Sequence, residues 1–238
     1  MKSRSILQKR FYDDLYKGYT EYKLENWRIS YMNRVFKLLG IGEEDVFLDV
    51  GVGGSGYTVI EAAKIGALAI GIGLSFEGMK KAHEFSKKAL AERASLCHFV
   101  ACSATNLPFK NKSISKLTSI AVLEHIPDDS KAIAEMHRIM KNHGAALITV
   151  PNAYELIFPI FRIACRLRDK HVGHLRTYNA EGLKNSFTDV VSPARDCFFM
   201  LIFRRLYSSS YAKCTPDLAS RTQSYGGYGK AWIQECLE

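Results

Sequence analysis

The sequence has no C-x-x-C pair among its six cysteines, which stand singly at positions 97, 102, 165, 197, 214 and 236. Neither a zinc site nor a disulfide framework is therefore indicated, and a reducing setting fits. No apolar run approaches the ~18 residues that a membrane-spanning helix needs. The polar start, Met1-Lys2-Ser3-Arg4, also lacks the apolar core of a signal peptide. We therefore expect a cytoplasmic protein that is soluble or at most peripheral to a membrane.

Acidic residues are fewer than basic ones: 24 Asp and Glu against 33 Lys and Arg give a net charge of +9. Such an excess fits binding to nucleic acid, to an anionic membrane or to an anionic substrate, and it equally fits a solvated basic surface. The chain has no internal repeat. With 238 residues, 47% of them hydrophobic and 24% charged, it has the size and composition of one globular α/β domain with elaborations.

The stretch that organises the chain is a glycine loop. An apolar run at 46–50 leads into four glycines within the six residues 51–56, and a helix-compatible segment, 58–64, follows. A strand, a glycine loop and a helix in this order open a nucleotide-type site, because the missing Cβ atoms let the backbone approach a ligand and the helix start supplies free N–H groups. Taken alone, the G-x-G-x-x-G spacing that begins at Gly51 is as typical of a tight turn as of a ligand site.

Asp49 separates two readings of this loop. A dinucleotide-binding loop aims N–H groups at a pyrophosphate, and an acid two residues before its first glycine would repel that ligand. A ligand that carries an ammonium and a sulfonium group but no phosphate would tolerate the acid or use it. The sequence therefore favours such a cation and argues against a dehydrogenase.

Asp49-Val50-Gly51-Val52-Gly53 resembles motif I of class I S-adenosylmethionine-dependent methyltransferases. Three later segments, 107–109, 118–127 and 147–152, resemble successive loop and strand segments of that family in order and spacing, so that the resemblance covers residues 45–152. The pattern is similar to the branch that methylates small molecules and lipid precursors. It implies a doubly wound, Rossmann-like α/β fold with a mostly parallel seven-stranded sheet, an N-terminal helical segment and a lid-like insertion after strand five.

The residue pattern places these elements along the chain. Apolar residues at three-to-four spacing predict helix over 5–39, which either packs on the domain or folds over the site. Strands are expected at 46–50, 67–72, 98–102, 116–122, 145–150, 190–191 and 197–203, and helices at 58–64, 75–93 and 128–141, with a turn at 142–144. We expect a single methyltransferase domain over 1–207, with its core at 45–152 and the lid at 153–176, and a loose tail over 208–238.

The family resemblance also implies a set of cofactor-binding residues. These are Asp49, Gly51, Val52, Gly53, Gly56, Gly73, Leu74, Ser103, Ala104 and Ala121. Three positions lack the acid that is usual in the family: Gly73 at the tip of strand two, Ser103 near the adenine and Ser115 before strand four. Glu77 is a candidate substitute for the first. Either backbone contacts and apolar walls still hold S-adenosylmethionine, which we favour, or the cofactor site is degenerate.

His125, at the end of strand four, is the best candidate for a catalytic base or a substrate ligand, with Glu124 placed to orient it; alternatively, it caps the loop. His174, which the resemblance places near the substrate mouth, is the second candidate. It shares an H-x-x-H spacing with His171, but no third ligand is nearby in the sequence and no metal site is expected. The basic amphipathic stretch 155–170 fits contact with a membrane surface, a cover over an apolar substrate, or a lid helix packed on the core.

The function that we expect is methyl transfer from S-adenosylmethionine to a small-molecule or lipid-like acceptor. The main alternative is a non-catalytic partner subunit that keeps the fold, motivated by the three missing acids. An RNA methyltransferase is suggested by the charge, but nucleic acid is disfavoured because the chain has no Asn-Pro-Pro-Tyr-type base-flipping motif and no appended RNA-binding module.

Overall fold

The computed structural model of the chain describes residues 2–18, 26–151, 173–188, 198–204 and 231–235. Its helices are α1 (Lys2–Lys17), α2 (Asn26–Leu39), α3 (Tyr57–Ile65), α4 (Phe76–Leu90), α5 (Asp129–Ile139) and α7 (Ala180–Thr188), with two 3-10 helices, η1 (Ala91–Leu96) and η2 (Leu123–His125). Its strands are β1 (Val46–Val50), β2 (Leu68–Gly73), β3 (Cys97–Ala101), β4 (Ile114–Ile120), β5 (Met140–Pro151), β6 (Phe198–Arg204) and β7 (Ala231–Glu235).

The strands form one sheet in the order β3-β2-β1-β4-β5-β6-β7. Neighbouring strands run parallel in each pair, and Asp49 in β1 lies opposite Gly71 on one side and Thr118 on the other. The parallel, doubly wound α/β sheet that the sequence predicts is confirmed in its core of β1 to β5. Chain order reverses between β1 and β4, and such a switch point opens a crevice outside the carboxyl ends of the strands.

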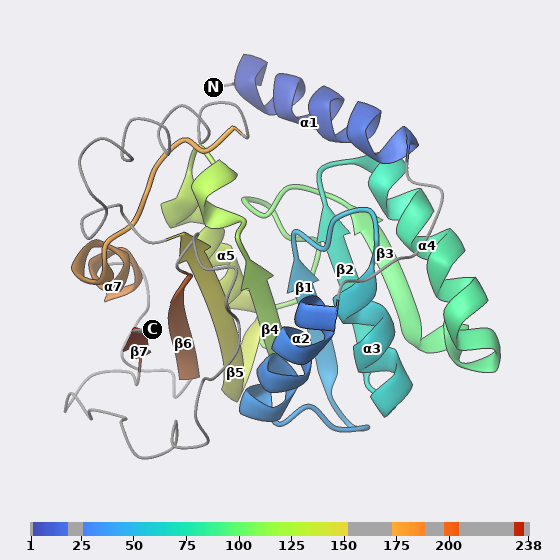
Figure 1. The fold of residues 1–238 in the computed structure, drawn as a ribbon. Helices are drawn as coiled ribbons and strands as arrows, with labels where there is room; N and C mark the ends of the chain where they lie inside the picture. Colours follow the sequence, from blue (N-terminus) through green and yellow to red (C-terminus); the bar gives the residue numbers. More distant parts are fainter. Residues whose placement is uncertain (1, 19–25, 152–172, 189–197, 205–230, 236–238) are drawn as a thin grey trace.

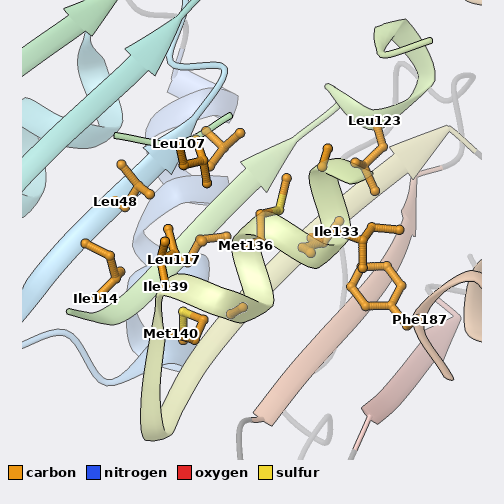
Figure 2. Close-up of a cluster of buried hydrophobic side chains, with 14 of the residues drawn as sticks. Leu48, Leu107, Ile114, Leu117, Leu123, Ile133, Met136, Ile139, Met140 and Phe187 are labelled. Atoms are coloured by element: carbon orange, nitrogen blue, oxygen red, sulfur yellow. The ribbon is translucent and has the colours of Figure 1, made fainter. Parts of the chain in front are cut away.

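Apolar side chains cover both faces of the sheet, as a parallel sheet requires. The consecutive residues Phe47 and Leu48 are both fully buried, because they point to opposite faces. Phe47 packs with α2, α3 and α4, and its ring meets Phe36 edge-on at 6.0 Å between centroids. Leu48 belongs to the layer of α5 and α7, in which Ile133 and Phe187 face the strands (Figure 2).

Helix α1 belongs to neither layer. It crosses above the arrowheads of the strands, over the edge where the carboxyl ends of β1 to β4 meet (Figure 1). No helix in the described part of the chain combines the length and the apolar composition that crossing a bilayer requires.

The predicted elements differ from the observed ones mainly at their ends. The helix expected at 75–93 ends at Leu90 and continues as η1. The turn expected at 142–144 lies inside β5, which pairs with β4 at Met140 and resumes at Ala145 after a register shift. The chain thus does bend away from regular pairing there, with His143 at a φ of 62°, but as a bulge within one long strand.

The C-terminal predictions are only partly covered by the described residues. The strand expected at 197–203 corresponds to β6, whereas 190–191 lies outside them. Within the tail expected over 208–238, the described residues are those of β7, which pairs with β6 between Phe199 and Phe203. Its short apolar run Ala231-Trp232-Ile233 suits a strand, but the many Ser and Gly before it hid that signal. Most of the predicted lid, including His171, and all of 155–170 lie outside the described residues.

Candidate active site

A cavity of about 710 Å³ lies over the carboxyl ends of β1 to β4. Its walls come from α1, from the loops that follow these four strands, and from the start of α5. Eight residues predicted from the sequence line it: Gly51, Gly53, Gly73, Leu74, Ser103, Ala104, Ala121 and His125. The other four, Asp49, Val52, Gly56 and His174, do not line it.

The glycine loop after β1 forms the floor of this cavity, between the two sides of the switch point. Gly51 and Val52 both donate to the Ile72 carbonyl, at 2.9 and 3.0 Å, which folds the loop back over β2. Gly51 has a φ of 85°, and a Cβ there would lie 2.3 Å from Val122 Cγ2. Gly53 has a φ of 67° and lines the cavity, with only the Tyr16 hydroxyl close to where a Cβ would stand, at 3.3 Å. The loop therefore needs glycine for its conformation and leaves its backbone open to a ligand.

Asp49 lies beneath the loop and is only 4% exposed. Thr118 Oγ1 donates to its Oδ1 at 2.7 Å, and Thr58 Oγ1 donates to its Oδ2. Burial raises the pKa of Asp49 to about 6, against the two threonine hydrogen bonds, which lower it. The acid thus ties the start of α3 to β4 and shapes the loop from below, which is a different role from the ligand contact that the sequence suggested.

The tip of β2 carries no acid that faces the cavity. Gly73 and Leu74 line it there, and Glu77, the candidate substitute, lies in the first turn of α4 outside the lining. At the start of α4, Ser75 instead binds a residue of α1. Ser75 Oγ accepts from the Gly78 N–H at 2.9 Å and donates to Asp13 Oδ1 at 2.5 Å.

The two serines that replace family acids differ in position. Ser103 lines the cavity, and its hydroxyl is 2.8 Å from Thr105 Oγ1, so it closes its own turn. Ser115 lies at the amino end of β4, away from the cavity, where its hydroxyl donates to Asp45 Oδ1 at 2.7 Å and accepts from the Val46 N–H at 2.9 Å. Its hydroxyl pairs the starts of β1 and β4, so the missing acid at Ser115 does not alter the cavity.

His125 ends η2 on the β4 side of the cavity. Its Nδ1 lies 3.2 Å from the Gly173 carbonyl, and its ring is edge-on to His174 at 4.8 Å and to Tyr12 at 6.3 Å between centroids. Burial, and then the His174 ring, lower the pKa of His125 to about 4, against the Gly173 contact. The imidazole is therefore neutral near pH 7.

A short segment, residues 173–178, brings His174 to this place. The Leu175 N–H donates to the Glu124 carbonyl at 2.8 Å, and Arg176 Nη2 donates to the Pro127 carbonyl at 2.7 Å. Arg176 also pairs with Asp129, whose Oδ2 accepts from the Tyr178 hydroxyl at 2.7 Å. Glu124 itself is fully buried. Segment 173–178 thus brings His174 to the adjacent residues Glu124 and His125, which precede it by about 50 positions in the sequence.

Helix α1 supplies cavity residues that the sequence analysis did not assign to the site. Gln8, Tyr12 and Tyr16 line the cavity. Two roles were considered for 5–39, and the one in which the segment folds over the site describes α1. Gln8 Nε2 donates to the His125 carbonyl at 2.7 Å, and Tyr12 and Tyr16 stack at 6.0 Å between centroids. Their four-residue spacing was the available signal. Lys131, in the first turn of α5, also lines the cavity, and nothing in the sequence pointed to it.

The parallel sheet and the cavity over its switch point are those of a Rossmann-like ligand-binding domain. Residues 48–148 match the family described as "Methyltransferase domain". The resemblance to class I S-adenosylmethionine-dependent methyltransferases that motif I indicated is therefore confirmed over this part of the chain.

Individual proteins agree with this assignment. A protein of Methanocaldococcus jannaschii, named only as uncharacterized, is 33% identical over 150 residues, which is 62% of this chain and 53% of that protein. Norajmaline N-methyltransferase of Rauvolfia serpentina is 34% identical over 113 residues, 47% of this chain and 37% of the enzyme. The YcgJ crystal structure from Bacillus subtilis superposes with a TM-score of 0.59 at 23% identity, covering 68% of this chain and 67% of that one, which shows a shared fold. The matched part of this chain spans about half the length of the first of these two sequence relatives and a smaller share of the second.

Proposed function

We propose that the protein binds S-adenosylmethionine in this cavity and transfers its methyl group to a small-molecule or lipid-like acceptor. The observation that carries the proposal is the glycine loop: Gly51 and Gly53 hold left-handed backbone at the floor of a cavity large enough for a nucleoside and a second molecule. The methyltransferase domain match covers the same loop.

The residues present fit the cofactor in shape more than in charge. The loop at Gly51 and Gly53 offers open backbone, and Leu74 and Ala104 give apolar walls over β2 and β3. When bound, S-adenosylmethionine supplies a methyl group activated by a positively charged sulfur. Because Gly73 and Ser103 bring no carboxylate, the protein binds through backbone and apolar contacts, and the charge-assisted hydrogen bonds of an acid are missing.

The acceptor half of the site is the β4 side. Ala121, Ile126 and Pro127 line it together with His125, so an apolar molecule would be desolvated there with one imidazole beside it. With Nδ1 turned to the Gly173 carbonyl, the lone pair of the neutral ring is on Nε2, which is then the hydrogen-bond acceptor for a proton on the nucleophile. Norajmaline N-methyltransferase, by its name, methylates a small molecule, which supports the acceptor class.

Calorimetric titration with S-adenosylhomocysteine tests the cofactor site. We expect micromolar binding, worth about −8 kcal/mol, and a loss of at least about a hundredfold in affinity in Gly53→Val. The matched control is Gly40→Val, because Gly40 has a φ of 58° with nothing within 4 Å of its Cβ position, at the end of α2 and away from the cavity. It carries the same backbone strain and should bind normally.

Two results would contradict the proposal. Equal losses in Gly53→Val and Gly40→Val would show that strain alone had disturbed the fold. No binding in a well-folded wild-type sample would leave Gly73 and Ser103 as marks of a degenerate site, and the partner-subunit alternative would replace methyl transfer.

A further inference from the structure

Three metal-ligating side chains meet beside the β4 side of the cavity, and His125 is the one of the three that lines it. Glu124, His125 and His174 each offer one ligand atom, and these atoms all lie within 4.8 Å of one another. Tetrahedral ligands bound to one ion at about 2.0–2.2 Å are ~3.3–3.6 Å apart. Side-chain movements of about 1–1.5 Å would therefore bring all three atoms to a shared ion.

The hydrogen bonding of His125 suits a metal ligand. A carbonyl oxygen can only accept, so the contact with the Gly173 carbonyl at 3.2 Å places the proton of the ring on Nδ1. Nε2 then carries a lone pair. Histidines that bind metals commonly donate their other N–H to a backbone carbonyl in this way, which fixes the tautomer and the ring orientation.

Glu124 adds negative charge where water is excluded. Its side chain is fully buried, and both carboxylate oxygens are shielded from solvent. A carboxylate oxygen at this position is an anionic ligand of the kind that divalent metal ions bind.

The position of His174 is built by contacts that do not involve its ring. Segment 173–178 is held to η2 and α5 by the Leu175 N–H, by Arg176 and by Tyr178. These contacts fix the backbone at His174 beside His125, and a ligand set of this kind needs such support to keep its geometry.

We propose that Glu124, His125 and His174 bind one divalent first-row transition-metal ion, such as Zn²⁺, with open coordination positions toward the cavity. Two imidazoles and one carboxylate suit ions from Mn²⁺ to Zn²⁺ and not Mg²⁺ or Ca²⁺, which prefer oxygen ligands alone. The site deepens the proposed function, on which its role rests. With the ion bound, the His125 Nε2 lone pair no longer accepts the proton of the nucleophile, and an acceptor oxygen that coordinates the ion would instead lose its proton to solvent more readily, as metal-bound water does. The ion-binding step itself does not depend on methyl transfer.

The experiment uses the full chain without an affinity tag, stripped of metal with a chelator. We titrate it with Zn²⁺ by calorimetry and with Co²⁺ by visible absorption, whose d–d bands report the ligand geometry. One equivalent of Zn²⁺ should bind with micromolar or tighter Kd. His174→Ala and Glu124→Gln should each weaken binding by on the order of a hundredfold, as the loss of one ligand in three implies. His98→Ala, which changes an exposed histidine on β3, is the matched control and should bind normally.

Titration of the same metal-free samples with S-adenosylhomocysteine separates this proposal from the proposed function. Cofactor binding without Zn²⁺ binding overturns the metal site and leaves methyl transfer standing. Zn²⁺ binding that His174→Ala and His98→Ala reduce equally also overturns it, because the ion would then occupy surface histidines. Should Glu124→Gln fail to fold, His174→Ala decides alone, with retained S-adenosylhomocysteine binding as its folding check.

Discussion

Protonation of the Asp49 side chain changes the stability of the fold. Its carboxyl group is buried, and its pKa of about 6 lies above the 3.8 of a free aspartate. The folded protein therefore holds this proton more tightly than the unfolded chain. Below pH ~4 the carboxyl is protonated in both states, and between about pH 4 and 6 only the unfolded chain loses the proton, so stability falls as pH rises through this window, by roughly 3 kcal/mol.

We expect Asp49→Asn to abolish that fall. Asparagine keeps the size of the side chain, accepts from Thr118 through Oδ1 and donates to Thr58 through Nδ2. Free energies of unfolding in urea, measured for both proteins between about pH 4 and 7, should show the variant gaining roughly 3 kcal/mol on the wild type as pH rises. A difference that stays constant with pH would show that Asp49 titrates normally.

Gly73 offers the reverse test, in which a group is added. Its Cβ position is 3.0 Å from Met79 Cε, the flexible end of a side chain that can move aside. If the ribose of the cofactor lies at the tip of β2, a carboxylate there would accept its hydroxyls. Hydrogen bonds to a charged group contribute about 1.5–3 kcal/mol. We expect Gly73→Asp to bind S-adenosylhomocysteine at least about tenfold more tightly than wild type.

Gly73→Asn is the control for that experiment, since it adds the same bulk without the charge and should change the affinity only a few-fold. Unchanged or weaker binding in Gly73→Asp, with the fold intact, would show that the ribose does not lie at this tip.

At the scale of elements, α1 is a cover whose attachment rests on few side chains. A helix of 16 residues is marginal on its own, so contacts with the domain must hold it. Asp13 is the main polar link to the domain, since its carboxylate accepts from Ser75 at the start of α4. Within α1, Lys9 also donates to this carboxylate, at 2.8 Å. Gln8 adds the bond to the His125 carbonyl.

Removing this link should loosen α1 selectively. We expect Asp13→Ala to speed hydrogen exchange of α1 amides by about tenfold, equivalent to ~1.4 kcal/mol for a hydrogen bond to a charged group. Asp14→Ala is a matched control: it makes the same change of residue one position along the helix, where the side chain is 76% exposed and pairs only with Lys17 among the described contacts. Equal acceleration in both variants would mean that α1 responds to helix propensity and not to the tether.

The difference between β1 and α1 shows what a sequence can reveal at this scale. The strand at 46–50 was predicted at its observed bounds, because an apolar run that ends in glycines is a local signal. The spacing of Tyr12 and Tyr16 showed a helix face but not which neighbour it covers. The meeting of His174 with Glu124 and His125 is a long-range contact made by segment 173–178, and no local pattern carries it. The role of Ser115 was also misjudged. Ser115 lies at the amino end of β4, which is the end of the sheet opposite the cavity, and the sequence alone does not show this position.

For the whole molecule, the cavity and the sheet order predict a single unfolding unit. Lining residues reach from Gln8 in α1 to Lys131 in α5, so one bound ligand contacts elements across much of the chain. On the other side, β6 pairs with β5 along its whole length, from Ala145 with Phe198 to Pro151 with Arg204. The C-terminal elements should therefore not unfold separately from the methyltransferase domain.

Differential scanning calorimetry with S-adenosylhomocysteine tests this coupling. A ligand present at 100 times its Kd stabilises the folded state by ~2.7 kcal/mol, and at about 2–4 °C per kcal/mol for a chain of this size the midpoint should rise by roughly 5–10 °C. We expect one transition, moved as a whole, in wild type and in Gly40→Val, and no shift in Gly53→Val. Two transitions of which only one moves would contradict the single unit, because β6, β7 and α7 would then be unfolding independently of the strands that carry the cavity.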